Sequence, residues 1–185
     1  MKVYTRAGDD GTTGLLFGGR VSKDSPQPVA YGGVDEAQAA IGVARSLTDQ
    51  GGALDEILVP LLRDLWVLMA ELATLPDNRH KLEAGATQVT PEMVTALEQL
   101  IDEVSERFEA PTEFVAPGQT RVSAALDVAR TVVRRAERDA LRAAADDSQV
   151  VPYLNRLSDL LWVLARWQEG VSLTTRSITS TEDSS

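Results

Sequence analysis

The chain has 185 residues, with 18 Lys and Arg against 28 Asp and Glu, one His and no Cys, and its net charge is −10. The lack of Cys excludes disulfides, Cys-based zinc and iron–sulfur sites, and a thiol nucleophile, while a single His argues against a His-based triad or a poly-His metal site. An acidic chain is also a poor nonspecific binder of nucleic acid, because that affinity depends on neutralising phosphates with Lys and Arg.

Length and hydropathy predict a single globular domain. Hydrophobic residues make up 43% of the chain and charged residues 25%, the balance of an ordinary soluble protein. No apolar run approaches 18 residues, and the opening residues Met1 to Tyr4 form no signal-peptide core, so we expect a cytoplasmic protein without a membrane span. We expect the domain to cover residues 1–171 and to be followed by a disordered Ser/Thr-rich tail over 172–185.

Helical periodicity dominates the chain after an N-terminal loop. Residues 5–25 are Gly-rich and show no helical period, which predicts an ordered loop. From about Val29 the apolar residues recur in steps of three or four, with Gly51-Gly52 separating the first two helices and Pro76 ending the second. Residues 76–90 are polar and irregular.

Three further helices are predicted over about 90–109, 119–145 and 149–169. Thr90 is the expected N-cap of the first of them, with Pro91 at its first helical position. Strand signals are nearly absent. The expected fold class is therefore all-α, a ferritin-like bundle of five helices with an ordered Gly-rich N-terminal loop.

The segment RTVVRRAERDALR, residues 130–142, holds five of the 18 cationic residues. At about 100° per residue, Arg130, Arg134 and Glu137 fall along the edge of an apolar arc. The forked guanidinium group of Arg matches the geometry of phosphate oxygens. The Glu carboxylate can hold the Arg side chains in place or accept a hydrogen bond from a sugar hydroxyl. The alternative is a solvated helix whose charges pair with one another at i,i+4. The arc comprises Val122, Ala125, Leu126, Ala129, Val133, Ala136 and Ala140, and the cations that point further out are Arg135, Arg138 and Arg142.

The N-terminal loop has the composition of a phosphate-binding loop. Gly8, Gly11 and Gly14 recur every three residues, so backbone N–H groups can converge on an anion. Lys23 follows as a point charge for a terminal phosphate. The loop is neither a Walker loop nor a dinucleotide fingerprint, because no Gly-Lys-Thr follows and no strand–helix unit surrounds it. A flexible Gly-rich arm is the alternative. The loop hydroxyls are those of Thr5, Thr12 and Thr13.

Two more polar residues stand next to apolar stripes. Asn155 flanks a Leu stripe in the last helix, where it can read a base or ribose or simply bond locally. Asp35, in the first helix, is placed to pair with an Arg of another helix. We assign no role to the single histidine, His80.

Taken together, these segments resemble the ATP:cob(I)alamin adenosyltransferases of the propanediol-utilisation type. The resemblance covers about residues 1–170 in family order. The chain departs from the family pattern at Leu126-Asp127, where the family usually reads Leu-His, and at Ala37 and Gln38, which replace Leu and Asn. The matching motifs are TRAGDDGTT (5–13), GRVSK (19–23), AYGGVDEAQ (30–38), FVAPG (114–118), RTVVRRAER (130–138) and NRLSD (155–159).

The resemblance implies a homotrimeric helical-bundle enzyme that transfers the 5′-deoxyadenosyl group of ATP to cob(I)alamin, giving adenosylcobalamin and triphosphate. It implies ATP, Mg²⁺ and cobalamin as cofactors and substrates, active sites between subunits, and handover to an adenosylcobalamin-dependent mutase, with no nucleic-acid or membrane partner. Co(I) is itself the nucleophile, so a chain without Cys suits this reaction, and the protein's task is positioning and charge stabilisation.

The resemblance also assigns residues to roles. It implies that Asp35 and Arg130 pair across the subunit interface, that Phe114 lies beside the lower face of the corrin, and that these three act in catalysis with Arg134. It assigns no protein ligand to a metal. A negative Asp127 near a triphosphate would lower affinity unless it points to solvent, as its helical angle allows. The implied ATP-binding residues are Thr5, Arg6, Gly8, Thr13, Lys23, Arg134, Arg135, Glu137, Arg138 and Asn155.

Two other functions stay open at this point. One is a noncatalytic ATP- or corrinoid-binding module that delivers cofactor, which would release no triphosphate. The other is a structural helical adaptor whose Arg row meets the carboxylates of a partner, and thermal stabilisation by Mg-ATP would argue against it.

Overall fold

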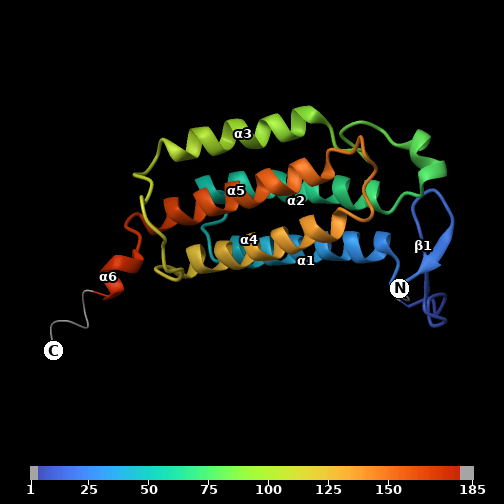
Figure 1. Ribbon diagram of the computed structural model, residues 1–185, viewed down its shortest axis with the longest axis horizontal. Helices are drawn as coiled ribbons and strands as arrows, with labels where there is room; N and C mark the ends of the chain where they lie inside the picture. Colours follow the sequence, from blue (N-terminus) through green and yellow to red (C-terminus); the bar gives the residue numbers. More distant parts are fainter. Residues whose placement is uncertain (1–3, 180–185) are drawn as a thin grey trace.

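The computed structural model of the chain describes residues 4–179, in which four long helices run side by side (Figure 1). They are α1 (Pro26–Ser46), α2 (Ala53–Leu72), α4 (Arg121–Ala140) and α5 (Val150–Glu169). Helix α1 packs against α2 and α4, and α4 packs against α5. The fifth long helix, α3 (Pro91–Ser105), lies on the outside of α5. The predicted helical bundle is confirmed.

The apolar arc predicted on α4 forms part of the core. Leu126, Ala129 and Val133 are fully buried, as are the small residues that follow on the same face. Helix α1 approaches this face closely, since a Cβ added at Gly33 would lie 3.3 Å from the Cα of Ala136. Burial of the arc fixes the rotation of α4 and therefore where its charged edge points.

Side-chain capping explains where α3 and α4 begin. The hydroxyl of Thr90 accepts a hydrogen bond from the backbone N–H of Met93 at 3.4 Å, which confirms the predicted N-cap of α3. Helix α4 opens with a reciprocal capping box between Thr120 and Ser123, with bonds of 3.0 and 3.1 Å. Helix α1 begins at Pro26, earlier than the predicted Val29, because proline is well tolerated in a first helical turn.

Two helices end earlier than their composition predicts. Helix α3 ends at Ser105 and not near residue 109, and α4 ends at Ala140 although alanines continue to residue 145. The buried carboxylate of Glu71 explains the second difference. It accepts hydrogen bonds from the hydroxyl of Ser148 and the backbone N–H of Val89, both at 2.7 Å. The bond from Ser148 draws the loop after α4 back onto α2, and this tertiary contact overrides local helix propensity.

The N-terminal loop contains a small hairpin that the sequence did not predict. Strands β1 (Thr12–Gly14) and β2 (Arg20–Ser22) pair antiparallel, with Thr13 opposite Val21. Strands of three residues are too short to show an alternation of apolar and polar side chains. The turn between them uses positive φ angles at Phe17, Gly18 and Gly19. Part of the polar segment 76–90 likewise forms a 3₁₀ helix, η1 (Pro76–Lys81).

The beginning of the expected tail is structured, in contrast to the predicted disorder over 172–185. The N–H of Ala116 donates to the carbonyl of Leu173 at 2.8 Å, and the N–H of Thr175 donates to the carbonyl of Phe114 at 3.0 Å. The short helix α6 (Thr175–Thr179) follows. Pairing with the loop before α4 orders this stretch despite its composition. The rest of the expected tail, 180–185, lies outside the described residues. Among residues 4–179, no helix is both long and apolar enough to span a bilayer.

Candidate active site

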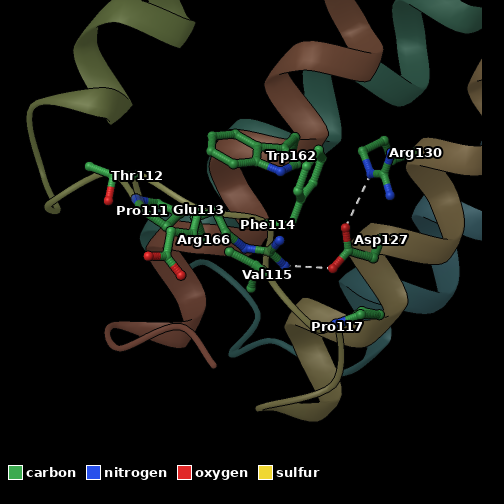
Figure 2. Close-up of a pocket in the computed structure, with 10 residues that line it drawn as sticks. All are labelled: Pro111, Thr112, Glu113, Phe114, Val115, Pro117, Asp127, Arg130, Trp162 and Arg166. Carbon is green, nitrogen blue, oxygen red and sulfur yellow. Dashed lines mark hydrogen bonds and ion pairs between the residues drawn. The ribbon is translucent and has the colours of Figure 1, made fainter. Parts of the chain in front are cut away.

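A cavity of about 540 Å³ opens at the end of the bundle where α4 begins and α5 ends (Figure 2). The loop over residues 111–117 forms one wall, and Asp127 and Arg130 of α4 and Trp162 and Arg166 of α5 form the other. The ring of Phe114 lies on the loop and is 87% exposed. A large aromatic side chain held in water beside a cavity is typical of a surface that a ligand covers.

Asp127 is buried in the wall of this cavity. It is 6% exposed, accepts a hydrogen bond from Nη2 of Arg166 at 2.5 Å, and accepts another from Nε of Arg130 at 3.1 Å. The suggestion that Asp127 points to solvent is therefore wrong. Its helical angle places it at the edge of the apolar arc, and α5 covers that edge with a guanidinium group.

Sequence reasoning missed Arg166. The guanidinium of Arg166 stacks over the ring of Trp162 at 5.7 Å and lies 3.0 Å from the carboxylate of Glu169. The Leu stripe of the last helix predicts its buried face, and an Arg near the end of such an apolar helix adds no separate signal. The available signal was Asp127 itself, since an acidic residue beside a core face needs a cationic partner.

Two cations further along α4 have no acidic partner in the part of the chain that the structure describes. Arg134 and Arg138 are both exposed, and within residues 4–179 neither forms an ion pair. Arg138 donates instead to the backbone carbonyl of Arg134 at 2.8 Å. The alternative of a helix whose charges pair at i,i+4 thus does not describe these two residues. Arg135 differs, because it pairs with Glu36 of α1, and that hydrogen bond raises the pKa of the Arg135 guanidinium.

Glu137 and Asn155 meet between α4 and α5. The side-chain amide of Asn155 donates to Oε1 of Glu137 at 3.1 Å. The alternative in which Asn155 bonds only to its own helix is therefore wrong for its side chain. The structure brings these two predicted site residues together at the same edge of α4 as Arg134.

The Gly-rich loop and its hairpin lie at the opposite end of the bundle from the cavity (Figure 1). Lys23 packs against the loop backbone, since a Cβ added at Gly8 would lie 3.2 Å from its ammonium nitrogen. Thr12 donates to Asp10 through both its hydroxyl (2.7 Å) and its N–H (2.9 Å), and these bonds lower the pKa of the Asp10 carboxyl. The loop is thus ordered by its own polar contacts.

Arg20 fastens this loop, a role that the sequence did not suggest. Its Nη2 donates to the carbonyl of Ala7 and to the hydroxyl of Thr12, both at 2.6 Å. Arg6 sits in the same loop with a φ of 62° and stacks over the ring of Tyr4 at 5.6 Å. Of the remaining predicted loop residues, Thr5 is exposed and Thr13 lies within β1.

Asp35 is not near Arg130 in the single chain. It lines a different cavity of about 370 Å³ on α1 and α2, next to Trp66, whose indole is 67% exposed. Arg130 pairs with Asp127 in its own helix. In the described part of the chain, no group of three or more His, Cys, Asp or Glu side chains is arranged to hold a metal ion.

A sequence profile of the cobalamin adenosyltransferase family matches residues 3–168. The chain belongs to that family. Corrinoid adenosyltransferases of Mycobacterium leprae and Mycobacterium tuberculosis (strain H37Rv) are 40% and 41% identical to this family member. The alignments cover 89% of this chain in each case, and 90% and 87% of the two relatives.

Solved structures agree with this membership. A PduO-type ATP:corrinoid adenosyltransferase from Lactobacillus reuteri, in a phenylalanine-to-histidine variant complexed with cobalamin and ATP, superposes with a TM-score of 0.84 at 30% identity. The match covers 95% of this chain and 97% of that one. An arginine-to-lysine variant complexed with ATP gives a TM-score of 0.81 at 29% identity and covers 94% and 100%.

Proposed function

We propose that this chain, a corrinoid adenosyltransferase by family, transfers the 5′-deoxyadenosyl group of ATP to the cobalt of cob(I)alamin and releases triphosphate. One observation carries the residue-level proposal. Helix α4 presents two cations, Arg134 and Arg138, that form no ion pair with the described residues, and it lines a cavity faced by the exposed ring of Phe114. The Lactobacillus reuteri variant that matches 95% of this chain is complexed with cobalamin and ATP.

The unpaired cations serve the triphosphate of ATP. Arg134 and Arg138 stand one turn apart on α4, so their guanidinium groups can act on successive phosphates. Lys23, held against Gly8, adds a charge from the N-terminal loop. The hydrogen-bonded pair of Asn155 and Glu137 offers an acceptor for a ribose hydroxyl. Thr5, Arg6, Thr13 and Arg135 complete the proposed nucleotide site.

The cavity serves the corrin. Phe114 presents an apolar ring with no donor atom to the lower face of the corrin, so it keeps a lower axial ligand away from cobalt. Cobalt without that ligand is easier to reduce, in the way that proteins tune cofactor metals through their surroundings. Arg130 stands at the half-exposed rim of the same cavity.

The proposed reaction forms no covalent bond between the protein and either substrate. The electron pair of Co(I) attacks C5′ of ATP, the C5′–O5′ bond breaks, and triphosphate leaves with the bonding pair. Arg134, Arg138 and Lys23 stabilise the charge that develops on the leaving group, and the site holds the two reactants in line. Mg²⁺ would enter with ATP and would help to neutralise the charge of the triphosphate.

The two halves of the site come from different subunits. The N-terminal loop and the cavity lie at opposite ends of one chain, so one copy cannot bring its own loop to its own cavity (Figure 1). We propose a homotrimer in which the exposed Trp66 is covered and Asp35 reaches Arg130 of the neighbouring copy. We further propose that the enzyme works in the cytoplasm and hands its product to an adenosylcobalamin-dependent mutase.

An anaerobic assay tests this function. The purified protein is mixed with cob(I)alamin and Mg-ATP, and we expect the absorption spectrum to convert to that of adenosylcobalamin with one triphosphate released per corrinoid. Binding of both molecules without triphosphate release would indicate a noncatalytic carrier instead. Failure of Mg-ATP to raise the melting temperature would favour an adaptor that uses its Arg row for protein contacts.

A further inference from the structure

We propose that Asp127 is a positioning residue, which holds Arg130 at the rim of the cavity in the orientation that the corrin requires. This inference rests on the proposed function. It concerns a residue whose two carboxylate oxygens are occupied by guanidinium groups and that acts through the guanidinium group of Arg130.

Four charged side chains form a continuous row from the interior to the rim. Glu169 contacts Arg166, Arg166 contacts Asp127, and Asp127 contacts Arg130, at 3.0, 2.5 and 3.1 Å (Figure 2 shows the last two contacts). The exposed fractions of these side chains rise along the row from 0 and 3% to 8 and then 30%. The row therefore has a fixed buried end and a single accessible end, which is Arg130.

The contacts of Asp127 divide its carboxylate between two partners. Oδ2 accepts from Arg166 and Oδ1 accepts from Arg130, so each oxygen is occupied by a guanidinium group. Arg166 cannot move away, because Glu169 and the ring of Trp162 confine it. A buried carboxylate fixed in this way restricts the rotamers of the longer and more exposed Arg130.

In the described part of the chain, Arg130 is held through its Nε nitrogen alone. Asp127 binds Nε, and among residues 4–179 its two terminal nitrogens form no hydrogen bond. These nitrogens remain available at the rim, where one can donate to Asp35 of the neighbouring copy in the proposed trimer and the other to the carbonyl of a neutral amide group at the edge of the corrin ring. The row carries two positive and two negative charges, so it orients a donor without giving the wall a net charge.

The test compares Asp127→Asn with the unchanged protein. Asparagine keeps the shape of the side chain but removes the charge that holds Arg130. We expect the KM for cob(I)alamin to rise about tenfold, while the KM for ATP stays within about twofold. Asp55→Asn is the matched control, because Asp55 is also 6% exposed and also accepts from an Arg Nε, at 2.6 Å from Arg45. We expect both KM values of that variant to be unchanged.

A double-mutant cycle identifies the residue through which Asp127 acts. In an Arg130→Met background, adding Asp127→Asn should raise the KM for cob(I)alamin no further. An equal rise in both backgrounds would overturn the proposal, and so would a wild-type KM in the single variant. If Asp127→Asn does not fold, Asp127→Ser repeats the cycle, because the smaller side chain leaves room for a water between the two guanidinium groups. Inactivity of the unchanged protein would instead contradict the proposed function.

Discussion

Arg130 and Arg134 are one helical turn apart on α4, yet their surroundings are opposite. Arg130 is half-buried and paired with Asp127, while Arg134 is exposed and has no acidic partner within the described residues. Around Arg130 the other charges are also paired, through Arg166 and Glu169. Beyond Arg134 the next turn repeats the unpaired state at Arg138.

This difference matches the two substrates that the family implies. A triphosphate is itself negatively charged, so the Arg side chains that bind it need no carboxylate partner. A neighbouring carboxylate would compete for these side chains and lower their affinity for the triphosphate. The periphery of a corrin is largely neutral, and a free guanidinium group in a partly buried wall would cost desolvation energy without a partner. We therefore propose that α4 contributes to two sites, with Arg130 paired at one end and Arg134 and Arg138 without acidic partners among the described residues at the other.

The largest effect is expected at Arg134, where a substitution tests the difference between the paired Arg130 and the unpaired Arg134. Arg134→Ala removes an unpaired cation that we assign to the leaving triphosphate, and we expect kcat/KM to fall roughly 10²- to 10³-fold. The fold should be preserved, because the side chain is exposed and forms no ion pair with residues 4–179. Steady-state kinetics with cob(I)alamin and Mg-ATP, alongside circular dichroism, measures both effects.

Arg142→Ala serves as the control for Arg134. Arg142 is exposed just beyond the end of α4, and we expect its removal to leave kcat/KM within about twofold of the original value. A comparable loss of kcat/KM in the two variants would mean that the activity depends on the net positive charge of the helix and not on the position of Arg134.

The same comparison shows what the sequence could predict. The buried arc of α4, the N-cap at Thr90 and the outward direction of Arg138 all follow from local periodicity and capping, and the structure confirms them. The pairing of Asp127 could not be predicted in this way. Its partner Arg166 lies 39 residues away on another helix. The end of α4 at Ala140 escaped prediction for the same reason, since the contact that sets it comes from Glu71 on α2.

At the corrin end, the sharpest test is Phe114. Phe114→Ala removes the exposed ring from the cavity mouth, and we expect the rate of adenosylation to fall about 10- to 100-fold. The loss should come from the step that needs cobalt without a lower ligand, so the spectrum of the Co(II) form with ATP should show less of the four-coordinate species. The KM for ATP should stay nearly constant. A full yield of that species in the variant would contradict the role of Phe114.

The smallest expected effect is at Arg20, at the nucleotide end. Arg20 carries no assigned contact to ATP, but it ties the carbonyl of Ala7 and the hydroxyl of Thr12 together and so fixes the loop that holds Lys23. Arg20→Met breaks these bonds, and because the side chain is partly exposed we expect only a roughly fivefold to tenfold rise in the KM for ATP.

The KM for cob(I)alamin should not change in Arg20→Met, because the loop and the cavity of one chain lie at opposite ends of the bundle. Arg63→Met is the control, since Arg63 is a surface residue of α2 whose contact to Asp64 is long, at 3.5 Å. A rise in the KM for cob(I)alamin as large as that for ATP would show that the loop orders both substrates. The corrin end near Arg130 and the nucleotide end near Arg134 would then be separate within one chain, but they would act on each other in the assembled site.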